Sequence, residues 1–453
     1  MTAPLTAVLG EFIARAAFGD LPRQAVETAR LGFIDCIAVA VAGAREPAVS
    51  LLRKTMTGTS DAYLVSARTH GADRAALFNG TAGHILDYDD VALQGHPSAV
   101  LVPAILAVAE DIEAPGSDML LAYAVGYEVW AELVSRDAEL HHNKGWHPTA
   151  VFGAVAAAAA VARLLRLDAT RSSHAIAVAA SMASGLVANF GSMTKSLHVG
   201  RAAQSGVLAA QLAQNGFTGA RDVIEHERGY LAALSPSGRI DVERPASLGS
   251  VWRLTETGLN VKRYPVCYCA SRLIDSALDL KAAQAIDPAS LKAIDVYVGT
   301  SASNILRNKT ASTGLEAKFS AEFTVASALV AGRVGRPELT DAFVNEPMVQ
   351  STARLVRRQL RPDTNSGDLP VAASDRVDIT LADGRTISGP EVVHARGANE
   401  RPLSEAELRE KFDDCLDSRS VDVRDRIFDR LWSLESLAAC PELVAELTIP
   451  ADR

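Results

Sequence analysis

The segment formed by residues 149–165 contains five consecutive alanines and is apolar along most of its length. Alanine is the strongest helix former, and its small side chain allows neighbouring helices to approach closely. A helix that is apolar on all sides is expected to be buried inside a protein. The segment therefore predicts a helical bundle that encloses this helix.

Further helical signals surround this segment in the sequence. They occur at residues 5–17, 22–41, 101–112, 119–133 and 195–215. Gly216 is placed to end the last of these helices.

The pattern changes after about Leu254. Residues 294–299 alternate as a half-buried strand does, and residues 377–387 predict a hairpin around an Asp-Gly turn. Residues 321–330 and 339–343 are predicted to be helical. Beyond Pro402, Ser404 and Glu407 form a capping box for a helix that runs through Leu416, and a further helix is predicted at 424–437. We therefore expect a mainly α protein, with a large all-helical domain built from residues 1–255 and 399–453 and a smaller α+β lid domain inserted at 256–398.

Charge and cysteine content narrow the class of protein. The formal net charge of the 453 residues is −9, which argues against nucleic acid or an anionic membrane as a partner. The five cysteines are scattered, so they form neither a disulfide framework nor a zinc site. The first residues lack a signal peptide, and the uncharged stretch 172–194 is too polar to span a membrane. We expect a cytoplasmic protein.

The first segment with candidate chemistry is His-Ile-Leu-Asp-Tyr-Asp-Asp at 84–90, followed by Gly-His-Pro-Ser at 95–98. Asp87 lies on a different side of the chain from Asp89, so one of them can face a pocket. His96 lies between Gly and Pro at a turn, a placement that favours a functional role. For Asp89 and Asp90 the alternative is a solvated helix end with one carboxylate holding a histidine.

Two more segments carry candidate acids and bases. In Gly-Trp-His-Pro-Thr at 145–149, Pro148 predicts a first helical turn, so His147 lies at a helix N-terminus, where the positive potential favours a neutral imidazole. In residues 193–201, Lys195 follows a long uncharged stretch and is three residues before His198, on the same helical face. Burial would favour release of its proton near neutral pH. The alternatives are a capping or packing role for His147 and a surface position for Lys195.

The fourth segment is Lys-Arg-Tyr-Pro-Val-Cys-Tyr at 262–268. Two adjacent cations before a proline turn suit the recognition of carboxylates, and Lys262 is the candidate. Cys267 is either an acid, a base or a packing residue.

The chain contains no phosphate-binding loop, dinucleotide fingerprint, His-Glu-x-x-His or nucleophile elbow. The candidate residues therefore come without redox or metal machinery, and we expect neither a cofactor nor a bound metal. This combination favours proton transfer next to a carboxylate, in which a base removes the α-proton and cations stabilise the developing negative charge.

Together the four segments resemble the MmgE/PrpD family, which includes 2-methylcitrate dehydratases, cis-aconitate decarboxylases and iminodisuccinate epimerase. Ala-Lys-Phe-Ser at 317–320 and Lys-Phe-Asp-Asp-Cys at 411–415 add to the resemblance. It implies a helical domain with an inserted α+β lid, a homodimer and a cofactor-independent site. The family's active-site residues fall on Asp87, His96, His147, Lys195 and Lys262.

The resemblance also bears on the reaction. In the decarboxylases of the family a Thr stands at the position of Val91 and a His at that of Cys267, while many members carry a His where this chain has Ser271. These differences argue against a cis-aconitate decarboxylase. Cys267 is nearer the dehydratase and epimerase branches, whereas the tightly spaced Gly-Trp-His and Met-Thr-Lys motifs resemble the epimerase and decarboxylase branches. The leading hypothesis is a lyase of dehydratase type that acts on a small di- or tricarboxylic acid.

In this hypothesis Lys195 and His147 exchange protons with the substrate, Asp87 orients His96, and Lys262, Cys267 and Lys318 bind the substrate. An epimerase is the close rival and would use His142 as a second base. A decarboxylase is less favoured, and Ser271 keeps open a relative that binds a carboxylate without catalysis.

Overall fold

The computed structural model describes residues 4–58, 64–364 and 371–448. The chain divides into two compact units, one formed by residues 1–259 and 405–453 and the other by residues 260–404. Helices dominate, and the described strands form a single small sheet, so the predicted mainly α class is confirmed. Whether the sequence ranges predicted above fold as independent domains stays a prediction.

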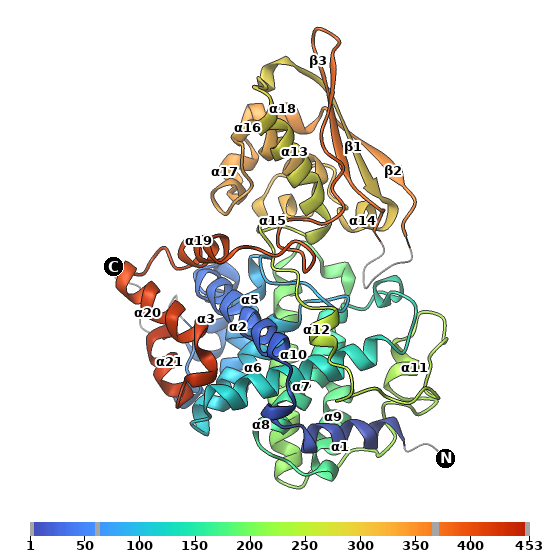
Figure 1. The fold of residues 1–453 in the computed structure, drawn as a ribbon, viewed down its shortest axis with the longest axis vertical. Coiled ribbons are helices and arrows are strands. Elements are labelled where there is room, and N and C mark those ends of the chain that lie inside the picture. The colour runs from blue at the N-terminus through green and yellow to red at the C-terminus, as the bar shows by residue number, and fades with distance from the viewer. Residues whose placement is uncertain (1–3, 59–63, 365–370, 449–453) are drawn as a thin grey trace. The chain divides into compact units, whose positions relative to one another are not determined.

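The first unit is a bundle of helices, labelled in Figure 1. Its helices are α1 (Leu5–Arg15), α2 (Arg23–Gly43), α3 (Pro47–Thr57), α4 (Ala67–His70), α5 (Ala72–Ile85), α6 (Pro97–Asp111), α7 (Gly116–Val134), α8 (Pro148–Leu164), α9 (Ala169–Met182), α10 (Met193–Gln214), α11 (Tyr230–Leu234), α12 (Arg253–Glu256), α19 (Glu405–Cys415), α20 (Val421–Trp432) and α21 (Cys440–Leu447). Short 3₁₀ turns include η2 (His141–Lys144) and η3 (Val187–Asn189). In the part of the chain that the structure describes, no helix combines the length and the apolar character needed to cross a membrane.

Helix α8 is the alanine-rich segment, and every residue in it except Arg163 is buried. It packs against α6, α7, α9 and α10. The contact with α10 is very close, because a Cβ atom built on Gly206 would lie only 2.3 Å from Cβ of Ala157. The prediction of a buried helix with close neighbours is confirmed.

Helices α5 and α10 cross almost backbone to backbone, and both carry residues of the candidate site. A Cβ atom on Gly200 would lie 2.2 Å from the carbonyl oxygen of Leu77, and one on Gly80 would lie 3.0 Å from Cα of Gly200. Only glycine allows this approach. The crossing brings the C-terminal end of α5 towards the N-terminal half of α10.

The C-terminal helices complete the first unit. Helices α19 and α20 pack on α2, and α21 packs on α6 (Figure 1). Within α19, Lys411 is buried and its Nζ lies 2.5 Å from Oδ1 of Asp35 on α2. The same ammonium group donates to the carbonyl oxygen of Tyr88 at 2.7 Å and lies 4.0 Å from the centre of the Tyr88 ring. One buried cation therefore ties the end of the chain to the segment after α5.

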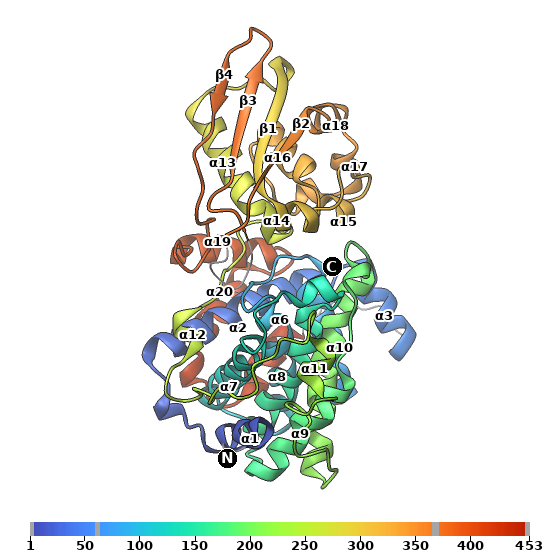
Figure 2. The same cartoon turned by 90° about the vertical axis from the view of Figure 1, so that its right-hand side faces the viewer.

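The second unit contains a four-stranded sheet with the order β2-β1-β3-β4 (Figure 2). Its strands are β1 (Leu291–Gly299), β2 (Val356–Arg361), β3 (Arg376–Leu381) and β4 (Thr386–Ser388). Strand β1 pairs with β2 in parallel, from Ile294 opposite Val356 to Gly299 opposite Arg361, and with β3 in antiparallel orientation. Strands β3 and β4 form the predicted hairpin, which is confirmed.

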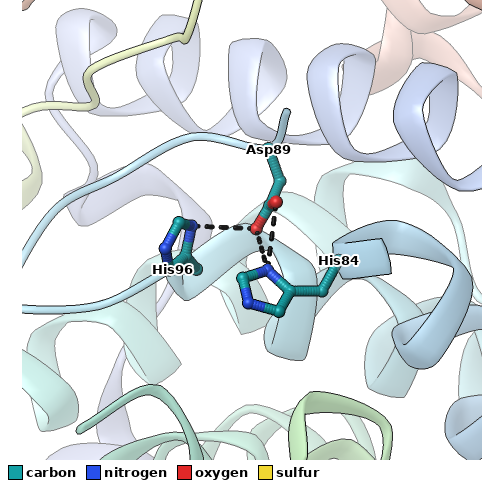
Figure 3. Close-up of side chains that lie close together, drawn as sticks. All are labelled: His84, Asp89 and His96. Atoms are coloured by element: carbon teal, nitrogen blue, oxygen red, sulfur yellow. Dashed lines mark hydrogen bonds and ion pairs between the residues drawn. The ribbon is translucent and has the colours of Figure 1, made fainter. Parts of the chain in front are cut away.

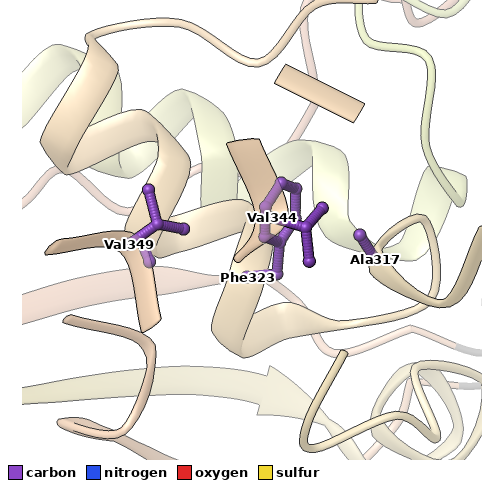
Figure 4. Packing of buried hydrophobic residues seen from close by; sticks show 5 residues of the cluster. Ala317, Phe323, Val344 and Val349 are labelled. Atoms are coloured by element: carbon purple, nitrogen blue, oxygen red, sulfur yellow. The ribbon is translucent and has the colours of Figure 1, made fainter. Parts of the chain in front are cut away.

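Helices cover this unit: α13 (Ser271–Ala283), α14 (Thr300–Ile305), α15 (Gly314–Ala317), α16 (Ala321–Ala331), α17 (Asp341–Val344) and α18 (Pro347–Ala353). The parallel pairing of β1 with β2 needs a long crossover, and α14 to α18 supply it. The crossover has an apolar cluster of its own, shown in Figure 4 and formed by Ala317, Phe323, Ala326, Val344 and Val349.

Two helix predictions were wrong in extent. The segment 339–343 is not one helix, because Thr340 ends one turn and caps α17 by accepting a hydrogen bond from the N–H of Phe343. The helix predicted at 424–437 ends at Trp432, where Ser433 leaves helical geometry with φ −113° and ψ 35°. In both places the residue at the helix boundary is a serine or threonine, a type that is favoured at helix ends over helix interiors.

Candidate active site

The loop between α5 and α6 carries the acidic motif and ends at His96. Asp87, Leu93 and Gln94 all have left-handed backbone, with φ of 53°, 52° and 61°. Such conformations are costly for residues other than glycine and persist where the surroundings enforce them. Trp130 contributes to that enforcement, because its Nε1–H donates to the carbonyl oxygen of Leu93 at 3.1 Å. The loop is thus held in one shape that regular secondary structure could not provide.

Asp89 lies at the centre of a buried cluster with two imidazoles (Figure 3). Its carboxylate lies 2.8 Å from Nδ1 of His84 and 3.0 Å from Nδ1 of His96. Burial by itself would raise the pKa of Asp89, but the two histidines hold this pKa well below its ordinary value. An ionised carboxylate only accepts hydrogen bonds, so Nδ1 of His84 donates to Asp89.

This geometry corrects one prediction and one alternative. Asp87 is predicted from the sequence to orient His96, whereas the carboxylate 3.0 Å from Nδ1 of His96 is that of Asp89. Asp89 and Asp90 are not a solvated helix end, because both are fully buried. At Asp87 the backbone is left-handed, so the chain departs there from the regular helix end that the alternative assumed.

Asp87 pairs with Lys195 instead. Oδ1 of Asp87 lies 2.7 Å from Nζ of Lys195, which is in the first turn of α10, and both side chains are almost completely buried. Nζ also lies 5.3 Å from the ring centre of Phe190. The ion pair with Asp87 holds Nζ of Lys195 in a fixed position inside the first unit.

His147 is the N-cap residue of α8, as predicted, and its side chain is buried. Its backbone N–H donates to the carbonyl oxygen of Gly185 at 3.0 Å, and its Nδ1 lies 3.2 Å from Nδ1 of His198. Burial, and then the charge of Lys195, hold the pKa of His147 well below its ordinary value. The imidazole is therefore neutral at pH 7 and can accept a proton.

The ring of Phe190 packs against two histidines of the candidate site, and this role was not predicted from the sequence. Its ring centre lies 4.8 Å from that of His147 and 6.1 Å from that of His142, both edge-on. Burial lowers the pKa of His142 to about 4, with contributions from nearby His141, His96 and Lys195. His142 is thus a second neutral imidazole near the same aromatic ring. In the sequence, Phe190 could have been noticed as an aromatic residue within a stretch of small and polar residues.

His84 also escaped the sequence analysis, although it begins the acidic motif. Its ring centre lies 4.5 Å from that of His96 and 6.0 Å from that of His147. It therefore links two candidate residues that come from different elements. The signal was a histidine at the end of α5, in which every residue except Asp73 and Arg74 is buried.

The remaining candidates belong to the second unit. The backbone N–H of Cys267 donates to the carbonyl oxygen of Lys318 at 2.9 Å, so these two residues are neighbours. Lys262 precedes them in the same unit. The roles of Lys262, Cys267 and Lys318 in binding a substrate stay predictions.

His84, Asp89 and His96 are also of the types that bind transition metals, and their ligand atoms lie within 4.8 Å of one another. In the structure the carboxylate accepts a hydrogen bond from Nδ1 of His84 and lies 3.0 Å from Nδ1 of His96. The carboxylate of Asp89 is therefore placed to orient both imidazoles.

Comparison with known proteins gives consistent matches along the chain. The MmgE/PrpD N-terminal domain matches residues 7–243, and the MmgE/PrpD C-terminal domain matches residues 264–434. Cis-aconitate decarboxylase of Homo sapiens is 29% identical over 392 residues, which are 83% of this chain and 79% of the human protein. The Mus musculus enzyme of that name is 28% identical, over 75% of this chain and 70% of its own length. Cis-aconitate decarboxylase of Aspergillus terreus is 29% identical, over 58% of this chain and 57% of its own length.

The two domain matches together cover most of the chain and include the loop of Asp89, the N-terminus of α8 and the first turns of α10. These are the segments that supply the buried ion pair and the neutral imidazoles. The chain belongs to the MmgE/PrpD family.

Proposed function

We propose that this protein transfers a proton at the carbon next to a carboxylate of a small di- or tricarboxylic acid, as a lyase of dehydratase type. The observation that carries the proposal is a buried acid and a buried base in one cluster. Nζ of Lys195 lies 2.7 Å from Oδ1 of Asp87 in a buried ion pair, while burial keeps His147 neutral. A buried amine beside a neutral imidazole supplies the two groups between which a proton can be exchanged with a substrate.

In the proposed reaction His147 takes the proton from the carbon next to a carboxylate. The electrons of that C–H bond form the new double bond as the neighbouring C–O bond breaks. Lys195 donates its proton to the departing hydroxyl group, which leaves as water. His96, oriented by Asp89, contacts the substrate beside them. The ammonium group also offsets the negative charge that develops on the carboxylate.

Decarboxylation is a second candidate, favoured by the relatives whose names state that activity. Loss of CO₂ would leave its electrons on the carbon, and Lys195 would supply a proton there. Epimerisation is a third candidate, favoured by His142, a second neutral imidazole at the ring of Phe190. It would require proton removal by one imidazole and return of a proton on the opposite face.

One experiment separates these reactions. The purified protein is incubated in D₂O with citrate, 2-methylcitrate, cis-aconitate or iminodisuccinate, and the products are followed by NMR. Dehydration gives a new alkene, epimerisation gives deuterium-labelled substrate without an alkene, and decarboxylation releases CO₂. Conversion of citrate or 2-methylcitrate to an alkene without release of CO₂ supports the leading proposal. If none of the acids exchanges a proton or is converted, the proposal is wrong and a carboxylate-binding relative without catalysis remains.

The family resemblance also predicts a homodimer. Light scattering coupled to gel filtration measures the mass, and a mass of one chain contradicts this prediction.

A further inference from the structure

The imidazole of His84 is held in a single tautomer. The ring lies at the end of α5 and is 1% exposed. Nδ1 lies 2.8 and 3.0 Å from the two carboxylate oxygens of Asp89. Because an ionised carboxylate must receive the proton of this hydrogen bond, Nδ1 carries the hydrogen. The other nitrogen, Nε2, therefore has a lone pair and no hydrogen.

Nε2 of His84 is buried and has no hydrogen-bond partner among the residues that the structure describes. A buried acceptor without a donor is costly, by an amount comparable to a lost hydrogen bond. The atom belongs to the candidate site, because the centre of the His84 ring lies 4.5 Å from that of His96 and 6.0 Å from that of His147. An acceptor in this position is suited to a donor that a bound molecule brings.

Nε2 of His84 does not become a donor by taking up a proton. Burial lowers the pKa of His84 to about 3, and the charge of Lys195 and the nearby His96 act in the same direction, against the opposing effect of Asp89. Nε2 thus stays an acceptor at neutral pH. A carboxylate oxygen of a substrate would meet lone pair against lone pair there, whereas a hydroxyl group would donate.

We propose that Nε2 of His84 accepts a hydrogen bond from a hydroxyl group of the substrate, so that the acid bound in this site is a hydroxy acid. This inference deepens the proposed function and rests on it. It makes His84 a residue in contact with substrate, in addition to those considered above. It also distinguishes the candidate reactions, because a hydroxy tricarboxylate has such a donor and an unsaturated acid such as cis-aconitate, fully ionised, has none.

The test uses two ligands that differ only in the hydroxyl group, citrate and propane-1,2,3-tricarboxylate. Their dissociation constants are measured by calorimetry, in the presence of a chelator, for the full-length protein and three variants. His84→Asn keeps an amide donor near the position of Nδ1 and removes Nε2. His84→Gln places an amide group, with its carbonyl oxygen, near the position of Nε2. His226→Asn changes an exposed histidine and is the matched control.

The wild type and His226→Asn are expected to prefer citrate by about tenfold, the usual scale of one hydrogen bond. In His84→Asn the preference is expected to disappear through weaker binding of citrate alone. His84→Gln is expected to keep part of the preference for citrate. If His84→Asn does not fold, the preference measured for His84→Gln tests the inference.

A preference that is unchanged in both His84 variants overturns the inference and leaves the proposed function standing. Equal weakening of both ligands also overturns it, because the imidazole would then act on the fold or through a water molecule. If neither acid binds the wild type, the proposed substrate class is wrong, and the inference fails with it.

Discussion

Oδ1 of Asp87 lies 2.7 Å from Nζ of Lys195, although 108 residues separate them in the sequence. The pair is buried, and removal of one member leaves the other as an uncompensated charge. Their attraction fixes the ammonium at the end of the loop that carries Asp89 and His96. The ion pair thus makes the position of the candidate acid depend on the shape of that loop.

Replacement of the candidate acid tests the mechanism most directly. Lys195→Ala is expected to lower kcat by at least about a hundredfold, the usual scale for a positioned acid or base. Lys54→Ala removes an exposed lysine of α3 and is expected to retain full activity. Steady-state kinetics on the acid identified by the NMR screen measure both. Equal activity of the two variants would exclude Lys195 as the acid.

The pH dependence tests the base. Because the pKa of His147 is lowered, its neutral form persists as the pH falls through 6.5, the ordinary value for histidine. We therefore expect kcat/KM to keep its level at pH 6 and to fall only at lower pH, after correction for ionisation of the substrate. Circular dichroism at each pH separates this loss from acid unfolding. Half-loss of kcat/KM near pH 6.5 would contradict the assignment.

The crossing of α5 and α10 leaves no room for a side chain at Gly200. Its Cβ atom would lie 2.2 Å from the carbonyl oxygen of Leu77, so Gly200→Ala must separate the helices. We expect a loss of about 1–3 kcal/mol in the free energy of unfolding, the scale of overpacking, together with lower kcat. Gly19→Ala is the control, because its Cβ atom would meet no atom within 4 Å. Urea denaturation measures both, and equal midpoints would refute the prediction.

The buried cation of α19 is expected to stabilise the first unit. Lys411→Met leaves Asp35 buried without its cation, and we expect a loss of about 3 kcal/mol in the free energy of unfolding. Burial already raises the pKa of Asp35, so uptake of a proton limits this loss. The double variant Lys411→Met/Asp35→Asn is expected to lose less than Lys411→Met alone. A double variant that is less stable than the single one would show that the buried pair is not the cause.

Much of the helical unit could be predicted from sequence, because its elements depend on local patterns. Pro148 defines the first turn of α8, and this placed His147 at a helix N-terminus as observed. The strand β2 was not predicted, because it is rich in charged residues and depends on parallel pairing with β1 across a long crossover. Long-range pairing of this kind leaves little trace in local periodicity.

In the candidate site, too, the residues that depend on local patterns could be predicted and those that depend on long-range contacts could not. Lys195 and Asp87 could be identified because their motifs combine charge with an apolar context. The roles of Asp89 and His84 could not, because they depend on left-handed backbone at Asp87 and on the approach of α5 to α10. An argument from periodicity assumes a regular helix or strand, and the chain is neither at Asp87.

The hydrogen bond from Lys411 to the carbonyl oxygen of Tyr88 spans 323 positions of the chain. A ribosome delivers Tyr88 and the acids around it long before it delivers Lys411, and chains begin to fold while they are being made. Until α19 emerges, the nascent polypeptide must keep Asp35 hydrated, or protonated, beside an unfinished loop. Formation of the candidate cluster is thereby tied to the synthesis of α19, and a product that stalls before this helix would hold the acidic motif without the cation that secures it.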